Sequence, residues 1–320
     1  MMGIILVAGG AGFIGSNLCE VLLKRNKRVL CVDNMSTGEK TNLESPLHKK
    51  NFQFIQGDIR DSNFVKSLHS REINEIYDLA SPASVTYLTE HPVDAATANS
   101  IGLLNLLKLA HTKKAKLLFA SSSECYGDPK EHPQKETYWG NVNCVGLRSG
   151  YDEGKRFGEA LCMAFHRELN VDIKIVRIFN TYGENTSVQD TRVIPRFAMQ
   201  ALLNKPLIIH GDGKQTRSFC YVSDLVDGIV RMIESNTTGP INLGNPDEYR
   251  VIDMAKKVIA MTGSSSKISF VKRPEDDPSK RKPDIGMARK ILGWEPKVYL
   301  EEGLKKTIEY FRKMLGKNNR

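Results

Sequence analysis

The chain has 320 residues, of which 40% are hydrophobic and 26% are charged, a composition typical of globular proteins. This length exceeds what a single core usually supports, so we expect one large domain and a smaller one. No apolar run approaches the roughly 20 residues that a membrane helix needs, and no targeting segment is evident, which predicts a cytoplasmic protein without a membrane partner. The net charge of +9 predicts a basic surface that attracts anionic ligands, and no basic–aromatic module for nucleic acid is present.

Cysteine and histidine spacing argues against metal chemistry. The six cysteines are scattered without a CxxC pair, and the seven histidines form no HExxH motif. We therefore expect reduced thiols and no metal site.

Short apolar runs alternate with amphipathic stretches in the first half of the chain. The predicted strands are 4–8, 28–32, 52–55, 75–79, 116–120 and 173–179, and the clearest helices between them are 14–24, 93–111 and 151–169. This alternation is typical of a parallel sheet that helices cover on both faces. We predict an α/β fold, with a Rossmann-type doubly wound parallel sheet over residues 1–179.

The pattern changes after Asn180, where glycines and prolines become frequent and the strands shorten. The helices predicted in this part are 193–203, 225–235, 252–262 and 301–315. We predict a smaller α+β lobe over residues 180–320 that binds the substrate, and a segment near 217–243 that returns to the first domain.

A glycine-rich turn joins the first predicted strand to the first helix. Gly9, Gly12 and Gly15 have the spacing GxxGxxG. Such a turn lets the backbone approach a pyrophosphate closely, and the N–H groups at the start of the helix donate to its phosphates. The turn therefore predicts a dinucleotide site.

Acidic residues at the ends of the next two strands extend this site. Asp33 ends the second strand, where a carboxylate binds the ribose hydroxyls of a dinucleotide. The following Asn34 and Met35 offer no guanidinium for a 2′-phosphate, which favours NAD over NADP. Asp58 follows the third strand and is expected near the adenine.

Tyr151 and Lys155 lie four residues apart at the start of a predicted helix and therefore share one face. A free tyrosine has a pKa near 10, and we expect the ammonium group and a cationic nicotinamide to lower this pKa. The pair would then remove a proton from a substrate hydroxyl while a hydride leaves the same carbon. Ser122, in the serine run after the fifth strand, would share that proton, because strand ends of this kind face the ligand crevice.

Motifs spread over nearly the whole chain carry a resemblance to a known family. They are GGAGFIG (9–15), LASPAS (79–84), SSSECYGDP (121–129), YWGNVN (138–143), YDEGKR (151–156), RIFNTYG (177–183), GDGKQTRSF (211–219), YVSDLV (221–226), NLGNP (242–246), DDPSKRKPDI (276–285) and LGWEP (292–296). The chain resembles the extended short-chain dehydrogenase/reductases, also called the NAD-dependent epimerase/dehydratase family. Within that group it is most similar to the UDP-glucuronate decarboxylases, or UDP-xylose synthases. The resemblance implies a catalytic NAD and a nucleotide-sugar substrate bound by the C-terminal lobe.

The resemblance implies a role for each matching residue. Tyr151 would be the base for the sugar C4 hydroxyl, with Lys155 as its electrostatic partner and Ser122 as the proton-sharing hydroxyl. Ser123 and Glu124 would face C5 and C6 of the sugar. The implied cofactor contacts, besides Tyr151 and Lys155, are Gly9, Gly12, Phe13, Ile14, Asp33, Asn34, Thr37, Asp58, Ile59, Leu79, Ser81 and Ala120. The implied substrate contacts, besides Tyr151, are Asn180, Arg192, Arg217 and Arg281, which would hold the diphosphate and uridine.

The implied reaction is the conversion of UDP-glucuronate to UDP-xylose by oxidation at C4, loss of CO2 and re-reduction by the same bound NADH. The alternatives are a nucleotide-sugar 4,6-dehydratase or 4-epimerase, a decarboxylase that releases the UDP-4-ketopentose, and an inactive cofactor-binding protein. A dehydratase needs an acid where Ser123 stands. Three departures from the family pattern concern the sugar: Thr97 replaces a usual lysine, Asp78 replaces a usual histidine, and Glu184-Asn185 follows RIFNTYG.

The resemblance also implies a homodimer. Helices 93–111 and 151–169 of two subunits would form a four-helix bundle. Ile101, Leu104 and Leu107 are spaced along one helix face, either as part of that interface or as core against the sheet.

Overall fold

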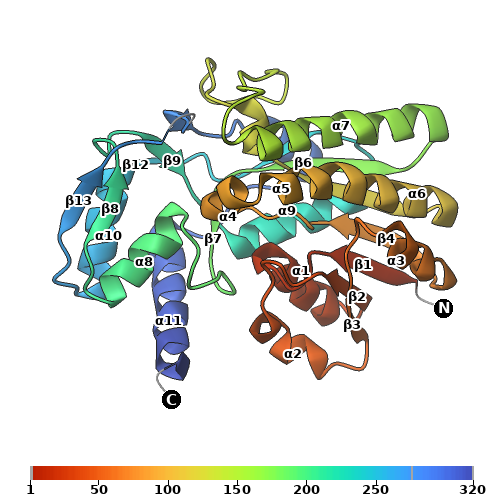
Figure 1. Cartoon of the computed structure of the whole chain (residues 1–320), viewed down its shortest axis with the longest axis horizontal. Helices are drawn as coiled ribbons and strands as arrows, with labels where there is room; N and C mark the ends of the chain where they lie inside the picture. The colour runs from red at the N-terminus through yellow and green to blue at the C-terminus, as the bar shows by residue number, and fades with distance from the viewer. Residues whose placement is uncertain (1–2, 275–276, 319–320) are drawn as a thin grey trace.

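The computed structural model describes residues 3–274 and 277–318 and is built around a parallel sheet of seven strands (Figure 1). The strands lie in the order β11-β6-β5-β4-β1-β2-β3. Their bounds are β1 (Ile4–Ala8), β2 (Arg28–Asp33), β3 (Phe52–Gln56), β4 (Ile73–Asp78), β5 (Lys116–Ser122), β6 (Ile173–Ile178) and β11 (Ile241–Leu243). The chain order reverses between β1 and β4, which confirms the predicted doubly wound α/β class.

Helices cover both faces of this sheet because its central strands are apolar on both sides. Helices α1 (Phe13–Lys24) and α9 (Val222–Glu234) pack on the face to which Val7 points. Helices α3 (Ser62–Ser67), α6 (Leu103–Lys113) and α7 (Ser149–Leu169) lie on the other face, to which Leu6 points. Successive strand residues thus enter opposite cores, as the two-residue period of a strand requires.

The predicted helix 93–111 is confirmed as a continuous helical segment, but it is not a regular α-helix throughout. It consists of α5 (Pro92–Thr97), a π-helical turn over Ala98–Gly102, and α6. Within the turn the side-chain amide of Asn99 donates to the Ala95 carbonyl at 2.8 Å and to Ser81 Oγ at 3.0 Å. Leu107 is fully buried in the core against the sheet, whereas Ile101 is 48% exposed. Leu107 is therefore part of the core, and it is not available for contact with a second subunit.

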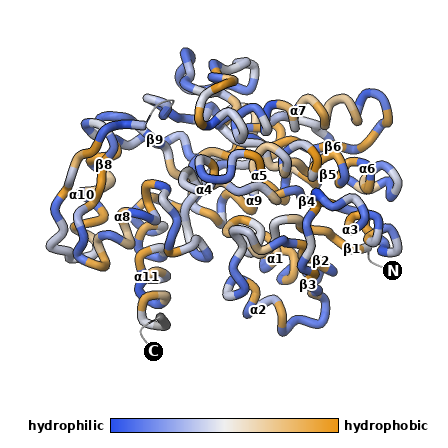
Figure 2. Tube along the Cα trace, in the orientation of Figure 1, coloured by the Kyte–Doolittle hydropathy of each residue, from blue (hydrophilic) through white to orange (hydrophobic). Residues whose placement is uncertain are grey.

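The C-terminal lobe is an α+β unit with its own apolar core, in which Phe197 and Leu304 are fully buried. Its helices are α8 (Val193–Leu202), α10 (Val251–Thr262) and α11 (Leu300–Asn318), and its strands are β7 (Thr181–Tyr182), β8 (Leu207–His210), β9 (Thr216–Ser218), β10 (Cys220–Tyr221), β12 (Glu248–Arg250), β13 (Ile268–Val271) and β14 (Lys280–Arg281). Figure 2 shows hydrophobic residues along the central strands and an alternation of hydrophobic and hydrophilic residues along α11. Between the strands of the lobe the chain crosses back: α9 packs on the large sheet and β11 pairs with β6.

Two further short helices are α2 (Glu44–Leu47) and α4 (Val85–Glu90). The part of the chain that the structure describes contains no helix with the length and apolarity that crossing a bilayer requires.

Candidate active site

A cavity of about 1050 Å³ lies at the carboxyl ends of the sheet strands and extends to the C-terminal lobe. Its walls come from the ends of β1, β2, β4, β5 and β6, and from α8, β8 and β9. Ligands bind at this edge of open α/β sheets. Every site residue predicted from the sequence lines the cavity, with the exception of Arg281.

The turn after β1 is packed too closely for side chains at two of its glycines. Gly9 has a φ of +77°, and a Cβ atom added there would lie 2.6 Å from the Leu79 carbonyl oxygen. A Cβ atom on Gly15 would lie 2.1 Å from the Gly9 carbonyl oxygen, so helix and strand pack too closely for a side chain. Gly12 is the N-cap of α1 and has no side chain to cap it. The first N–H groups of the helix therefore remain available as donors, which fits a pyrophosphate.

Asp33 is buried at the end of β2 and faces the cavity. Its Oδ2 accepts a hydrogen bond from the backbone N–H of Ala11 at 2.9 Å, and its Oδ1 accepts one from Met35 at 2.9 Å. Burial raises the pKa of Asp33, and these backbone hydrogen bonds oppose that rise. A carboxylate has about four acceptor sites, so the group retains acceptors for ribose hydroxyls.

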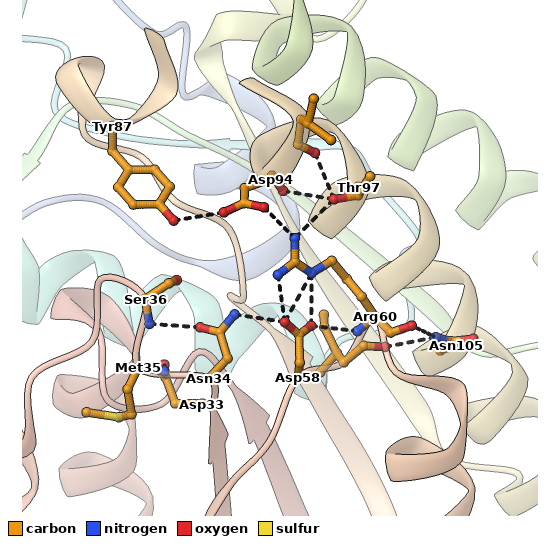
Figure 3. A network of polar contacts seen from close by, with 12 residues as sticks. Asp33, Asn34, Met35, Ser36, Asp58, Arg60, Tyr87, Asp94, Thr97 and Asn105 are labelled. Carbon is orange, nitrogen blue, oxygen red and sulfur yellow. Dashed lines mark hydrogen bonds and ion pairs between the residues drawn. The ribbon is translucent and has the colours of Figure 1, made fainter. Parts of the chain in front are cut away.

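An arginine that the sequence reasoning missed lines the cavity beside Asp58 (Figure 3). The guanidinium of Arg60 donates to both oxygens of Asp58, with Nη2 2.7 Å from Oδ2, and its Nη1 lies 2.8 Å from Asp94 Oδ1. These bonds lower the pKa of Asp58 to about 2. Both carboxylates are therefore ionised at neutral pH, and together they satisfy the guanidinium.

The same network reaches helix α4 and the loop after β2. The hydroxyl of Tyr87 donates to Asp94 Oδ2 at 3.0 Å, and the amide of Asn34 donates to Asp58 Oδ2 at 3.1 Å. Tyr87 and Asn34 both line the cavity. The position of Arg60 beside Asp58 in the sequence was the available signal, but its contact with Asp94 depends on the tertiary structure.

Tyr151, Ser122 and Lys155 meet at the centre of the cavity. A hydrogen bond with Ser122 acts to lower the pKa of Tyr151, but burial is the larger effect and raises it. The Nζ atom of Lys155 lies 5.6 Å from the centroid of the Tyr151 ring and donates to the Ala120 carbonyl at 2.6 Å. Among the groups of the protein itself, burial has the largest effect on the pKa of this phenol, and the lowering expected from Lys155 together with a cationic nicotinamide stays a prediction.

Lys155 has an anionic neighbour on β4. Burial lowers the pKa of Lys155 to about 8, and the charge of Asp78 opposes that shift. Burial also raises the pKa of Asp78 to about 6, and here Lys155 opposes the shift. The two groups thus favour each other's charged form inside the protein.

Glu124 is held between two arginines. Its Oε2 lies 2.8 Å from Arg148 Nη2 and 3.3 Å from Arg281 Nη2. Burial acts to raise the pKa of Glu124, but the charges of Arg148, Arg281 and Arg217 outweigh it and lower the pKa to about 2. Glu124 is therefore an ionised carboxylate at neutral pH, unable to donate a proton.

Arg281 does not line the cavity, contrary to the expectation that it contacts the substrate directly. It lies on β14 and is only 1% exposed. Its guanidinium donates to the carbonyls of Ser123 and of Gly127, the latter at 2.9 Å. These carbonyls and Glu124 hold the guanidinium behind the cavity wall.

The C-terminal lobe contributes basic and amide donors to the far end of the cavity. Arg192 pairs with Asp190 at 2.6 Å, and Arg217 pairs with Asp277 at 2.9 Å. The Nδ2 atom of Asn180 is buried without a hydrogen-bond partner. An unsatisfied buried donor at a cavity wall fits an acceptor on a ligand, such as a phosphate oxygen.

Two further cavity arginines were missed by the sequence reasoning. Arg196, on α8, has its Nη1 3.0 Å from His210 Nε2. Arg148 is the N-cap residue of α7, and its Nε has no hydrogen-bond partner. Arg148 precedes Tyr151 by three residues, and this proximity in the sequence could have identified it as a site residue.

The three departures from the family pattern all have structural partners. Thr97 Oγ1 accepts a hydrogen bond from Arg60 Nη1 at 3.2 Å. Asp78 faces Lys155, as described above. The loop at Glu184-Asn185 is tied to α1, because the Asn185 amide donates to Ser16 Oγ at 3.1 Å.

The glycine turn, the acidic end of β2 and the buried Tyr–Lys pair define a dinucleotide-binding α/β enzyme. Within the described ranges, no group of histidine, cysteine or carboxylate side chains is arranged to hold a metal ion. A family model described as GDP-mannose 4,6 dehydratase matches residues 6–307.

Curated relatives refine this class. UDP-glucuronic acid decarboxylase 1 of Xenopus tropicalis is 47% identical over 97% of this chain and 72% of its own length. UDP-glucuronic acid decarboxylase 4 of Arabidopsis thaliana is 48% identical over 96% of this chain and 68% of its own length. The chain belongs to the NAD-dependent epimerase/dehydratase family and, within it, to the UDP-glucuronic acid decarboxylases.

Solved structures share the whole fold. UDP-glucose 4-epimerase from Thermotoga maritima, with UDP-glucose, has a TM-score of 0.91 and 32% identity, over 98% of this chain and 99% of that one. UDP-glucuronic acid 4-epimerase from Bacillus cereus, in complex with UDP-glucuronic acid and NAD, has a TM-score of 0.88 and 31% identity, over 97% and 99% of the two chains.

Proposed function

We propose that this protein releases CO2 from UDP-glucuronate and forms UDP-xylose, with NAD as a bound catalytic cofactor. The observation that carries this proposal is that one cavity brings together the glycine turn, the Tyr151–Ser122 pair and the arginines of the C-terminal lobe. The relationship to UDP-glucuronic acid decarboxylases over 96–97% of the chain supports the choice of substrate.

The chain's own groups provide a fitting site for NAD. The N–H groups around Gly12, Phe13 and Ile14 would bind the pyrophosphate, and Asp33 would bind the adenosine ribose. We assign further contacts to cavity residues Gly9, Asn34, Thr37, Asp58, Ile59, Leu79, Ser81 and Ala120. When bound, NAD accepts a hydride from the sugar and later returns it, so no net oxidant is consumed.

Tyr151 acts in this proposal as the base for the C4 hydroxyl, with Ser122 sharing the proton. Because burial raises the pKa of Tyr151, the phenol needs neighbouring positive charge before it can accept a proton. The ammonium of Lys155 is held near the ring by its bond to the Ala120 carbonyl and contributes such charge.

Carbon dioxide leaves after C4 has become a ketone. The C5–C6 bond breaks, and its electron pair is delocalised onto the C4 oxygen. A proton then returns to C5, and Tyr151 protonates the C4 oxygen when the ketone is reduced. Ser123 and the ionised Glu124 lie at this part of the cavity, so Glu124 acts there through its charge.

The nucleotide would be held by the C-terminal lobe. We assign the diphosphate and uridine to Asn180, Arg192 and Arg217, since guanidinium groups and a free amide donor suit phosphate oxygens. In the described arrangement, Arg281 acts on the site through Glu124 and not by direct contact.

The test is to incubate the NAD-loaded protein with UDP-glucuronate labelled at C6 and to measure CO2 and the product mass. The proposal requires UDP-xylose and an equal amount of CO2, without accumulation of free NADH. UDP-galacturonate without CO2 would identify a 4-epimerase instead, and a UDP-4-ketopentose with stoichiometric NADH would identify a decarboxylase that releases its intermediate. A dehydratase is disfavoured because Ser123 is too weak an acid to protonate a leaving hydroxyl.

We also propose a homodimer built through α5, α6 and α7. Exposed apolar side chains include Val93 on α5, Ile101 in the π-helical turn between α5 and α6, and Phe157 on α7, of which Phe157 is 51% exposed. These residues would face the same elements of a second subunit in a four-helix bundle. The cytoplasmic location stays a prediction from the sequence.

Light scattering at micromolar concentration tests the dimer. The wild-type protein should have twice the mass of one chain, and Phe157→Glu should shift it to the single-chain mass. Leu203→Glu, at an exposed apolar residue at the end of α8, should leave the mass unchanged. A wild-type protein with the mass of one chain would contradict the proposal.

A further inference from the structure

We propose that Arg148 binds the C6 carboxylate of the uronate substrate and makes the site selective for uronates over neutral hexoses. The inference rests on the proposed function and assigns one residue to the recognition of its substrate class.

Arg148 is fixed close to the reacting centre. It is the N-cap residue of α7, and its carbonyl accepts a hydrogen bond from the Tyr151 N–H at 3.0 Å. Its side chain is 13% exposed and lines the cavity. Its Nη2 is paired with Glu124, whereas its Nε is buried, lies 3.9 Å from Asp152 Oδ2 and has no hydrogen-bond partner. The guanidinium therefore retains a donor that makes no hydrogen bond in the protein.

The chemistry of a uronate places its carboxylate near this guanidinium. C5 is bonded to C4 and carries the carboxylate, so a C4 hydroxyl bound at Tyr151 and Ser122 brings the carboxylate to the neighbouring residues, Ser123 and Glu124. Glu124 is itself ionised. Two carboxylates at one site repel each other unless a cation lies between them, and a guanidinium with five N–H donors can serve both.

The other described arginines at this end of the cavity are less suited. Arg192 and Arg217 pair with Asp190 and Asp277, which like them belong to the C-terminal lobe, and Arg196 lies beside His210 on the same lobe. Arg281 does not line the cavity. Arg148 is the one whose backbone is bonded directly to that of Tyr151.

This contact predicts an effect on binding more than on the chemical step. A cation that holds the carboxylate stabilises the bound substrate, and its contribution falls as the negative charge moves from C6 to the C4 oxygen. Interactions that do not strengthen in the transition state change KM more than kcat. Because Arg148 also pairs with Glu124, its affinity for the substrate carboxylate is limited. Glu124 remains its partner after CO2 has left.

The test compares Arg148→Gln with the wild type in the NAD-loaded protein. Calorimetry, with Tyr151→Phe added to both proteins so that the substrate is not turned over, would give the Kd of UDP-glucuronate, UDP-glucose and UDP. Loss of a charge-assisted hydrogen bond should raise the Kd of UDP-glucuronate about 10- to 100-fold. The Kd of UDP-glucose should change by no more than about twofold. The steady-state KM for UDP-glucuronate should rise more than kcat falls.

Arg156→Gln is the matched control, because Arg156 lies on the same helix but donates to the Trp139 and Cys125 carbonyls. It should leave the ratio of the two affinities unchanged. Arg148→Lys keeps the charge but cannot bridge two carboxylates in the same way. It should therefore lower the affinity for UDP-glucuronate relative to UDP-glucose, by less than Arg148→Gln does. If Arg148→Gln does not fold, this lysine variant carries the test.

An unchanged Kd for UDP-glucuronate, or an equal loss for both sugars, would overturn the proposal, as would an unchanged ratio in Arg148→Lys. Failure of the proposed function gives a different result, since the wild type would then release no CO2. A selective loss of UDP-glucuronate binding in such a protein would still support carboxylate recognition by Arg148.

Discussion

The arginines at the two ends of the cavity differ in how fully their guanidinium groups are paired. At the end proposed to bind adenosine, Arg60 lies between Asp58 and Asp94 and also donates to Thr97. At the substrate end, the described lining residues include four arginines against three carboxylates. The arginines are Arg148, Arg192, Arg196 and Arg217, and the carboxylates are Glu124, Asp190 and Asp277.

Under the proposed function, this difference would direct NAD and the nucleotide sugar to separate ends of one cavity. A guanidinium saturated by carboxylates offers little to an added phosphate, which suits the uncharged ribose hydroxyls of NAD. Unused donors, such as Nε of Arg148 and of Arg196, favour an anionic ligand. The net charge of +9 gives no indication of this division.

The largest expected effect comes from Tyr151, which belongs to the reacting centre between the two ends. Tyr151→Phe should reduce CO2 release at least about 1,000-fold, because positioned acid–base groups contribute 10²- to 10⁴-fold. Binding of UDP-glucuronate and retention of NAD should stay within about threefold of the wild type. Tyr138→Phe, at a residue outside the cavity lining, is the control and should keep full activity. Normal turnover by Tyr151→Phe would remove this residue from the mechanism.

Removing the negative charge of Asp33 should make the proposed adenosine end more favourable for an anionic group, as the substrate end is. Asp33→Asn should raise the affinity for NADP relative to NAD about 10-fold, because a carboxylate beside the ribose repels a 2′-phosphate. Fluorescence titration with both reduced dinucleotides would measure the ratio. Asp212→Asn, on an exposed turn, should not change it. An unchanged ratio in Asp33→Asn would show that this carboxylate does not select the cofactor.

A smaller effect is expected from the buried Asp78–Lys155 pair. Because Asp78 favours the charged form of Lys155, Asp78→Asn should lower the pKa of Lys155 below its value of about 8. Activity that needs the ammonium would then begin to fall at lower pH, with a loss of severalfold above pH 8. Profiles of kcat/KM against pH for both proteins would measure the shift. Coincident alkaline limbs would mean that Asp78 does not influence Lys155 during turnover.

The smallest effect is expected on stability, from the packing of α7 on β5. A Cβ atom on Gly158 of α7 would lie 2.5 Å from Cζ of Phe119 on β5. Gly158→Ala should therefore reduce the free energy of unfolding by about 1–3 kcal/mol through overpacking. Gly316→Ala, in α11 with no atom within 4 Å of the added Cβ, should instead stabilise the protein by up to about 1 kcal/mol. Urea unfolding would measure both, and equal effects would contradict the packing of α7 on β5.

The sequence was sufficient for the fold and for the residues that follow strand ends. The apolar runs, the glycine spacing and the Tyr151–Lys155 pair are local patterns, and the structure joins them at one edge of the sheet. The charge networks were not predictable in this way. The pairs Arg60–Asp94 and Arg281–Glu124 join residues 34 and 157 positions apart, so only the folded chain shows which guanidinium groups are satisfied.

Burial is a second property that local reasoning did not supply. The spacing of Tyr151 and Lys155 gave no sign of how strongly burial raises the pKa of the phenol. Helical spacing left open whether Ile101 and Leu107 belong to an interface or to the core, whereas the structure buries Leu107 in α6 and exposes Ile101 in the π-helical turn.

The most direct test of the central claim follows a label at C4 of the sugar. UDP-glucuronate carrying deuterium at C4 would be converted with unlabelled NAD, and the product would be analysed by mass spectrometry and NMR. The account predicts UDP-xylose that retains nearly all of the deuterium at C4, because the cofactor stays bound and returns what it received. Loss of the deuterium to free NADH or to water would contradict an internal oxidation and reduction in this cavity.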